Sequence, residues 1–149
     1  MLTPPRPEAQ ANWKTRFRAA AVLWAAIARN NPRRGLVCTN RDGVYQLYGW
    51  DVDSGDLHQL TTQQTGVAQG MISSDGESVY YHQDQYGSEI GHYVRLPFVG
   101  GEASDITPDL LPYASFSISQ SVNGAVTGFM SASLDGFKIY TMVDGEAPQ

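Results

Sequence analysis

Histidine and cysteine are the side chains of this sequence that could bind a transition metal. The three histidines, His58, His82 and His92, are far apart, without HxH, HxxxH or HExxH spacing, and Cys38 is the only cysteine. Zinc sites collect their ligands from closely spaced pairs of such residues. The sequence therefore predicts no zinc site and no intrachain disulfide. Cys38 lies in the expected strand 36–39, and we interpret it as a small buried hydrophobic residue.

The segment 51–56 (Asp-Val-Asp-Ser-Gly-Asp) has an acidic spacing similar to that of a calcium loop. Gly55 stands where a third ligand is needed, and Thr62 occupies the place of the bidentate glutamate. We therefore interpret the segment as a hairpin turn. The glycines of 66–70 and 100–101 do not lead from a strand into a helix with a phosphate-loop lysine. We expect no metal site and no cofactor.

A sequence repeat predicts the strands and turns that must position these residues. Polar-Asp-Gly or Asn-Gly turns separate short apolar runs, and two of the units end in a threonine, Thr61 and Thr107, about 46 residues apart. The turns that we expect to reverse the chain between antiparallel strands are Asp42-Gly43, Asp75-Gly76, Asn123-Gly124 and Asp135-Gly136. Repeats of this length, with four short strands each, are typical of β-propeller blades.

The repeat predicts a mainly β fold, an incomplete β-propeller of about three four-stranded antiparallel blades. We place the blades at about 35–62, 66–109 and 112–149, within a propeller region 35–149. Propellers close with roughly four to eight blades. The third copy has not supplied its fourth strand by residue 149, so we expect the chain to be an N-terminal piece of a longer protein. If it were a complete product, its exposed blade edges would predict self-association.

Charge is distributed unevenly along the chain. Residues 1–34 carry seven basic side chains and one acidic one, whereas residues 35–149 carry three basic and fourteen acidic ones. An acidic body argues against binding to a phosphate backbone. We expect no nucleic-acid partner, and we expect the basic arm 1–34 to lie against an acidic surface of its own protein.

The arm contains an apolar stripe that predicts an amphipathic helix. Trp13, Phe17, Ala20, Trp24 and Ile27 recur at helical spacing. Pro32 would end this helix.

An alternative is that residues 13–28 act as a secretory signal, with 26–28 as a small-x-small cleavage site. The apolar run 19–28 is too short to span a bilayer, which takes about 20 residues. We expect a cytoplasmic protein without a membrane partner, and an exported one if the signal alternative holds.

The run from Gly35 to Pro112 resembles the propeller of bacterial prolyl oligopeptidase family enzymes, the acylaminoacyl-peptidase and dipeptidyl-aminopeptidase branch. The resemblance rests on short motifs at 35–37, 46–48, 51–52, 59–61, 72–76, 89–92 and 97–101. The related TolB-type propeller repeat has the same Ser-x-Asp-Gly and Leu-Thr ends. The resemblance implies an N-terminal propeller that screens substrates for a C-terminal α/β-hydrolase domain with a Ser, Asp and His triad.

The sequence departs from this family at the catalytic motif. A hydrolase of this type carries its nucleophile on a Gly-x-Ser-x-Gly elbow, which is absent from the chain. Serines such as Ser73 and Ser117 have neither an elbow nor an identifiable base. We therefore assign no catalytic, cofactor-binding or metal-binding residue, and this chain alone is not expected to hydrolyse peptides.

Two hypotheses follow. In the first, the chain is the non-catalytic propeller part of a serine peptidase and gates access to a hydrolase domain. Its partners are then the missing hydrolase domain, the remaining blades and the peptide substrate. In the second, it belongs to a TolB-like propeller scaffold that mediates protein–protein interaction.

Overall fold

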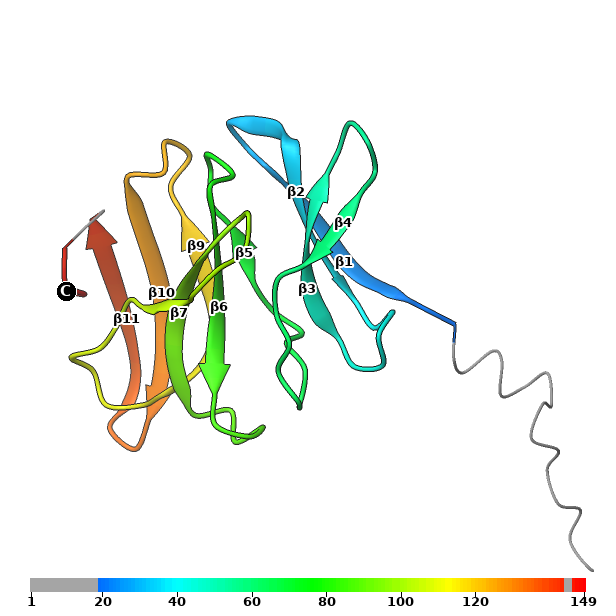
Figure 1. The fold of residues 1–149 in the computed structure, drawn as a ribbon. Helices are drawn as coiled ribbons and strands as arrows, with labels where there is room; N and C mark the ends of the chain where they lie inside the picture. Colours follow the sequence, from blue (N-terminus) through cyan, green and yellow to red (C-terminus); the bar gives the residue numbers. More distant parts are fainter. Residues whose placement is uncertain (1–18, 144–145) are drawn as a thin grey trace, which may run out of the picture.

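The computed structural model describes residues 19–143 and 146–149 of the chain. The described residues contain no helix and form strands that run back and forth in sequence order (Figure 1). The strands are β1 (Val22–Ala28), β2 (Asn31–Thr39), β3 (Gln46–Asp51), β4 (Leu57–Gln59), β5 (Met71–Ile72), β6 (Ser78–Asp84), β7 (Gly91–Pro97), β8 (Ser104–Asp105), β9 (Ala114–Gln120), β10 (Val126–Ser133) and β11 (Gly136–Val143). The predicted mainly β architecture is confirmed.

The strands form three antiparallel sheets, each a simple meander. Sheet A has the order β1-β2-β3-β4, sheet B the order β5-β6-β7-β8, and sheet C the order β9-β10-β11. The first strand of each sheet (β1, β5, β9) is an edge strand. Three strands of sheet C lie in the described part, and Gln149 exchanges two backbone hydrogen bonds with Thr141 of β11. Sheets A, B and C follow one another as consecutive blades.

The predicted N-terminal helix is wrong where the structure describes it. Residues 22–28 form β1, in which Trp24 lies opposite Cys38 and Ala26 lies opposite Leu36 of β2. The stripe that looked helical is a short apolar run, and its pairing with β2 outweighs the modest helix propensity of its alanines. Pro32 lies inside β2 instead of ending a helix. The part of the predicted helix at residues 13–18 lies outside the described residues.

Apolar side chains of sheets A and B meet to form the larger core. Leu36, Leu47 and Val79 are fully buried between the two sheets, and Val94 and Leu96 of β7 join them. In β2, β3 and β6 runs of four or five consecutive residues are buried, so both faces of these strands are covered. The aromatic side chain of Tyr81 of β6 belongs to the same cluster.

An aromatic cluster joins sheet B to sheet C. Tyr93, Tyr113 and Phe129 are buried, with Phe129 stacked on Tyr113 at a centroid distance of 5.4 Å and on Tyr140 at 5.3 Å. Met142 of β11 completes this second core. The two cores place the three sheets side by side, with sheet B between the other two (Figure 1).

The turns and the closing threonines behave as the repeat predicts. Each of the four Asp-Gly and Asn-Gly turns connects two antiparallel strands, and its glycine has a positive φ, as in Gly76 at 75° and Gly124 at 78°. Thr61 is buried and its Oγ1 accepts a hydrogen bond from the Leu47 amide. Thr107 is also buried, and its hydroxyl lies 3.0 Å from that of Tyr113. These threonines fasten the end of one blade by satisfying buried polar groups.

One face of sheet C is covered by none of the described residues. Register places Phe137, Ile139 and Val143 of β11 on the face away from Phe129 and Met142. Phe137 is 73% and Ile139 80% exposed. In sheet A, the equivalent face is buried against sheet B. Sheet C therefore exposes the apolar face that would pack against the next blade in a propeller.

Candidate functional site

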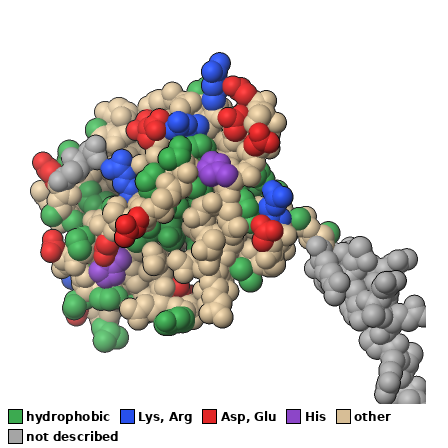
Figure 2. Space-filling model, in the orientation of Figure 1, with side chains coloured by type: hydrophobic (Ala, Val, Ile, Leu, Met, Phe, Trp, Pro, Cys, Tyr) green, Lys and Arg blue, Asp and Glu red, His purple; other side chains and the backbone are tan. Residues whose placement is uncertain are grey.

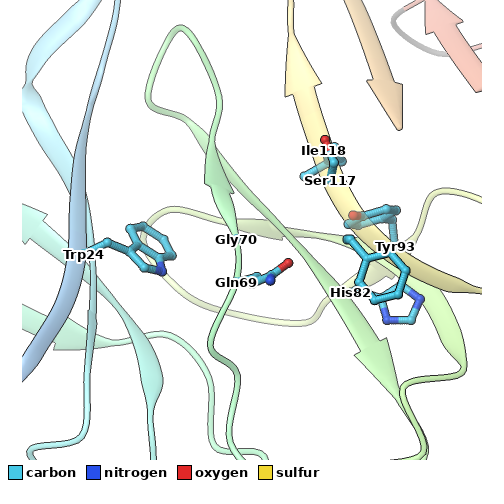
Figure 3. Close-up of a pocket in the computed structure, with 8 residues that line it drawn as sticks. Trp24, Gln69, Gly70, His82, Tyr93, Ser117 and Ile118 are labelled. Atoms are coloured by element: carbon cyan, nitrogen blue, oxygen red, sulfur yellow. The ribbon is translucent and has the colours of Figure 1, made fainter. Parts of the chain in front are cut away.

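Residues of all three sheets, or of the segments that lead into them, border a cavity of about 260 Å³. Trp24 comes from β1, Gln69 and Gly70 from the segment before β5, and Ser117 and Ile118 from β9 (Figure 3). His82, Tyr93 and Phe116 complete the lining. The strands β1, β5 and β9 are the first strands of consecutive sheets, and the blades of a propeller surround a central channel.

Trp24 fixes one wall of the cavity. Its indole points from β1 toward Gly70 in Figure 3, and its Nε1 donates a 2.8 Å hydrogen bond to the Ala68 carbonyl. This bond joins sheet A to the segment that leads into sheet B. Gly70 leaves no room for a side chain, since a Cβ there would lie 2.6 Å from Leu47 Cδ1. The wall is therefore positioned by the same contacts that pack sheets A and B.

His82 and Tyr93 form the opposite wall and are held by hydrogen bonds. The Nε2 of His82 lies 2.9 Å from the Tyr113 carbonyl, and its ring meets Tyr93 edge to face at 5.3 Å. Burial lowers the pKa of His82, and the Tyr113 carbonyl opposes this effect. The Tyr93 hydroxyl lies 2.9 Å from Ser115 Oγ, and burial raises its pKa. This wall therefore presents a neutral imidazole and a neutral phenol near pH 7.

The structure does not bring the three histidines together. His58 Nε2 lies 2.6 Å from the Phe98 carbonyl, between sheets A and B. His92 Nδ1 lies 2.9 Å from Asp105 Oδ2, close to the edge strand β8 of sheet B. No group of three or more histidine, cysteine, aspartate or glutamate side chains that could hold a metal occurs among residues 19–143 and 146–149.

The acidic segment 51–56 forms the turn between β3 and β4. Asp51 Oδ1 accepts the Ser54 amide at 2.8 Å, and Asp53 pairs with Arg33 at 3.2 Å. Hydrogen bonds from Ser54 hold the pKa of Asp51 below its ordinary value. The carboxylates are thus used by the turn and by an exposed ion pair, in keeping with the hairpin interpretation.

The two serines considered as nucleophiles lie in different environments. Ser73 accepts the Ser78 amide at 2.9 Å and bonds to Asp75, so its hydroxyl belongs to the Asp75-Gly76 turn. Ser117 lies on β9 and lines the cavity. In the described part of the chain, neither serine hydroxyl is hydrogen-bonded to a histidine. The geometry offers binding groups in the cavity and no nucleophile with an adjacent base.

Cys38 is a core residue, as its position in the strand predicts. It is fully buried, its Sγ lies 3.6 Å from the Val67 carbonyl, and burial raises its pKa to about 11. The thiol is therefore protonated at neutral pH.

Sequence reasoning did not find the cavity. Its lining comes from three sheets, and its key residue, Trp24, lies in the strand that was predicted as a helix. The one available signal was Gln69-Gly70, a polar residue and a glycine directly before the strand β5. On the face seen in Figure 2, several acidic side chains gather at the upper right beside a basic one, and the other charged side chains are scattered among apolar and uncharged polar groups. None of the described residues belongs to a helix that could span a membrane.

The chain matches no protein-family model and no curated protein sequence. Its fold is similar to that of a TolB protein from Agrobacterium tumefaciens, with a TM-score of 0.67 and 22% identity over 87% of this chain and 48% of that one. It is also similar to a prolyl endopeptidase structure, with a TM-score of 0.66 and 13% sequence identity. This match covers 89% of the present chain and 22% of the endopeptidase chain. A third structural neighbour is the tricorn protease, with a TM-score of 0.65 and 12% sequence identity. This match covers 82% of the present chain and 13% of the tricorn chain.

The chain spans about half or less of the length of each of these structures. The matches cover 82–89% of this chain and support the fold expected from the repeat. The described chain is therefore a stretch of TolB-like β-propeller, whose structural neighbours are TolB and the propeller domains of prolyl oligopeptidase-type peptidases.

Proposed function

We propose that this chain is the non-catalytic propeller part of a serine peptidase and that it controls the access of peptides to a separate hydrolase domain. The observation that carries the proposal is the cavity at the edge strands of all three sheets. A channel lined by such edges is the route through a propeller. Puromycin hydrolase, the tricorn protease and a prolyl endopeptidase are among the proteins with this fold.

The residues that line the cavity could bind a peptide or let it pass, but they do not form a site that would hydrolyse it. Trp24, Tyr93 and Phe116 offer apolar surface, while Gln69 and Ser117 offer hydrogen bonds. Small-molecule and peptide sites combine these two kinds of group. The three histidines have backbone or carboxylate neighbours instead of a serine hydroxyl. In this proposal the Ser, Asp and His triad is supplied by residues outside the chain.

The test begins by reading the coding sequence through and beyond codon 149 and expressing the open reading frame that is found. The product and residues 1–149 are then assayed with an aminoacyl chromogenic substrate, with and without a serine-directed phosphonate. Turnover by the longer product that the phosphonate abolishes, with none from residues 1–149, is the expected result. A longer product without an elbow and without turnover would overturn the proposal.

A TolB-like scaffold is the second candidate. It is favoured by the Agrobacterium protein, which combines a TM-score of 0.67 with 22% identity, above the 12–16% of the peptidases. In this case the blades would present a surface for another protein, and we would expect export, in line with the signal alternative for residues 13–28. An open reading frame that ends with a propeller closure strand would support this candidate.

A further inference from the structure

Three adjoining hollows form one groove along the first strands of the sheets. The central hollow is the cavity of about 260 Å³ described above. It shares Trp24, Gly70 and Ile118 with a second hollow of about 340 Å³. It shares Gln69, His82 and Phe116 with a third hollow of about 360 Å³. The two outer hollows have no lining residue in common, so they lie at opposite ends of the groove.

The groove follows strand β9. Gln120 and Ser119 line the second hollow, Ser117 the central one, and Ser115 the third. From Ser115 to Gln120 an extended strand rises about 17 Å, at about 3.3 Å per residue. An extended peptide of about five residues has the same length. Among residues 19–143 and 146–149 no strand pairs with the outer edge of β9, so its backbone is available to such a ligand.

The two ends of the groove carry opposite charges. Arg29 lines the second hollow, and no ion pair of Arg29 occurs within the described part of the chain. Asp84 and Glu89 line the third hollow. The Glu89 amide donates to Asp84 Oδ2 at 2.7 Å, which holds the two residues together. Glu89 and Tyr86 both have positive φ, at 61° and 55°, which is uncommon for residues other than glycine.

We propose that this groove binds a short peptide of about five residues by both of its free termini. The ammonium group lies beside Asp84 and Glu89, the carboxylate lies beside Arg29, and a central apolar side chain packs against Trp24 and Phe116. The peptide then runs parallel to β9. This arrangement requires opposite charges separated by the length of the ligand, which a zwitterionic peptide has and an internal segment of a folded protein lacks.

This inference goes beyond the proposed function, because binding uses only residues of this chain and needs no hydrolase domain. It would give the propeller a preference for short, already cleaved peptides. A groove that requires both free termini discriminates against loops and long chains, because these do not have two free termini about five residues apart.

The proposal is tested by isothermal titration calorimetry of residues 1–149 with the peptide Ala-Ala-Phe-Ala-Ala. The peptide is used in four forms: with free termini, N-acetylated, C-amidated, and with both modifications. We expect each modification to weaken binding about tenfold, as loss of a hydrogen-bonded charge does. Equal affinity for all four forms, or no binding of the free peptide at millimolar concentration, would overturn the proposal.

Two variants assign the ends of the peptide. Arg29→Gln is expected to remove the preference for the free carboxylate and to keep the preference for the free ammonium group, and Glu89→Gln is expected to do the reverse. Arg33→Gln is the matched control, because Arg33 is 80% exposed and pairs with Asp53 at the β3–β4 turn. An Arg29→Gln variant that discriminates between carboxylate and amide like the Arg33→Gln control would overturn the assignment.

The outcomes separate this inference from the peptidase proposal. If residues 1–149 bind the peptide and the longer product shows no turnover, the peptidase proposal is refuted and the proposal of a peptide-binding groove stands. Phosphonate-sensitive turnover by the longer product, without terminus-dependent binding, would refute the groove and leave the peptidase.

Discussion

Replacing Thr61 by valine should destabilise the protein far more than an isosteric exchange normally does. Thr61 is 3% exposed and its Oγ1 has two partners. It accepts the Leu47 amide at 2.9 Å and donates to Gln46 Oε1 at 2.7 Å. Both partner residues are buried, Leu47 at 0% and Gln46 at 4% exposure. Valine fills the same volume but leaves a donor and an acceptor unsatisfied in the core.

The magnitude follows from the cost of unsatisfied buried groups. Each costs about 1–3 kcal/mol, so the two groups left by Thr61→Val should lower the free energy of unfolding by about 2–6 kcal/mol. With a urea m-value of about 2 kcal/mol/M, the unfolding midpoint should fall by about 1–3 M. Thr61→Ser keeps the hydroxyl and removes one methyl group, which should cost about 1 kcal/mol.

The assay is urea unfolding of residues 1–149, followed by circular dichroism and tryptophan fluorescence. Thr62→Val is the matched control, because Thr62 is adjacent in sequence and exposed, and its variant should stay within about 0.5 kcal/mol of the parent. A Thr61→Val midpoint equal to that of Thr62→Val would refute the reasoning that the blade-closing threonine satisfies buried polar groups.

Four further outcomes follow from the structure. Burial lowers the folded-state pKa of His82 below its ordinary value of 6.5, so its contribution to the free energy of unfolding is fully present above pH 6.5 and is lost as the pH falls below that value. In urea titrations from pH 7.5 to 5, His82→Gln should therefore reduce the dependence of the free energy of unfolding on pH. An unchanged pH dependence in this variant would contradict the reasoning. Cys38 should react with a disulfide reagent at pH 8 only on unfolding, whereas rapid reaction in native buffer would show that the thiol is accessible. Gly91→Ala places a Cβ 1.9 Å from the Gln83 carbonyl oxygen and should cost about 3 kcal/mol or more, while Gly128→Ala, with its nearest atom at 3.6 Å, should fold normally; similar melting temperatures would refute this. Ile139→Lys on the open face of sheet C should reduce concentration-dependent association of residues 1–149 in sedimentation, and association that stays unchanged would place the contact elsewhere.

Local chemistry made the turns and the blade ends predictable. Asp75-Gly76 and Asn123-Gly124 need nothing beyond their own residues to reverse the chain, because glycine adopts a positive φ at little cost. The threonines that end the units were recognisable by spacing alone. Their role as buried hydrogen-bonding groups became clear only from their partners, such as Leu47 for Thr61.

Pairing with a neighbouring strand determined the secondary structure of residues 22–28, which the sequence alone did not. The run at residues 22–28 has alanines that suit a helix and apolar side chains that suit a strand, and the ladder with β2 selects the strand. The groove was hidden for a similar reason. Arg29 and Glu89 are 60 positions apart in the sequence, and only the stacking of sheets A, B and C places them at the two ends of one depression.

The position of β1 determines how the gene can be shortened. The sequence suggested a boundary near residue 34, which would delete β1 and the first four residues of β2. The product would expose a free edge beside Leu36 and Cys38 and would lose the indole bond to Ala68. Ala21 also exchanges backbone and side-chain hydrogen bonds with Asn40. Expression clones and protease-trimmed samples that are meant to keep the first blade must therefore begin upstream of Ala21.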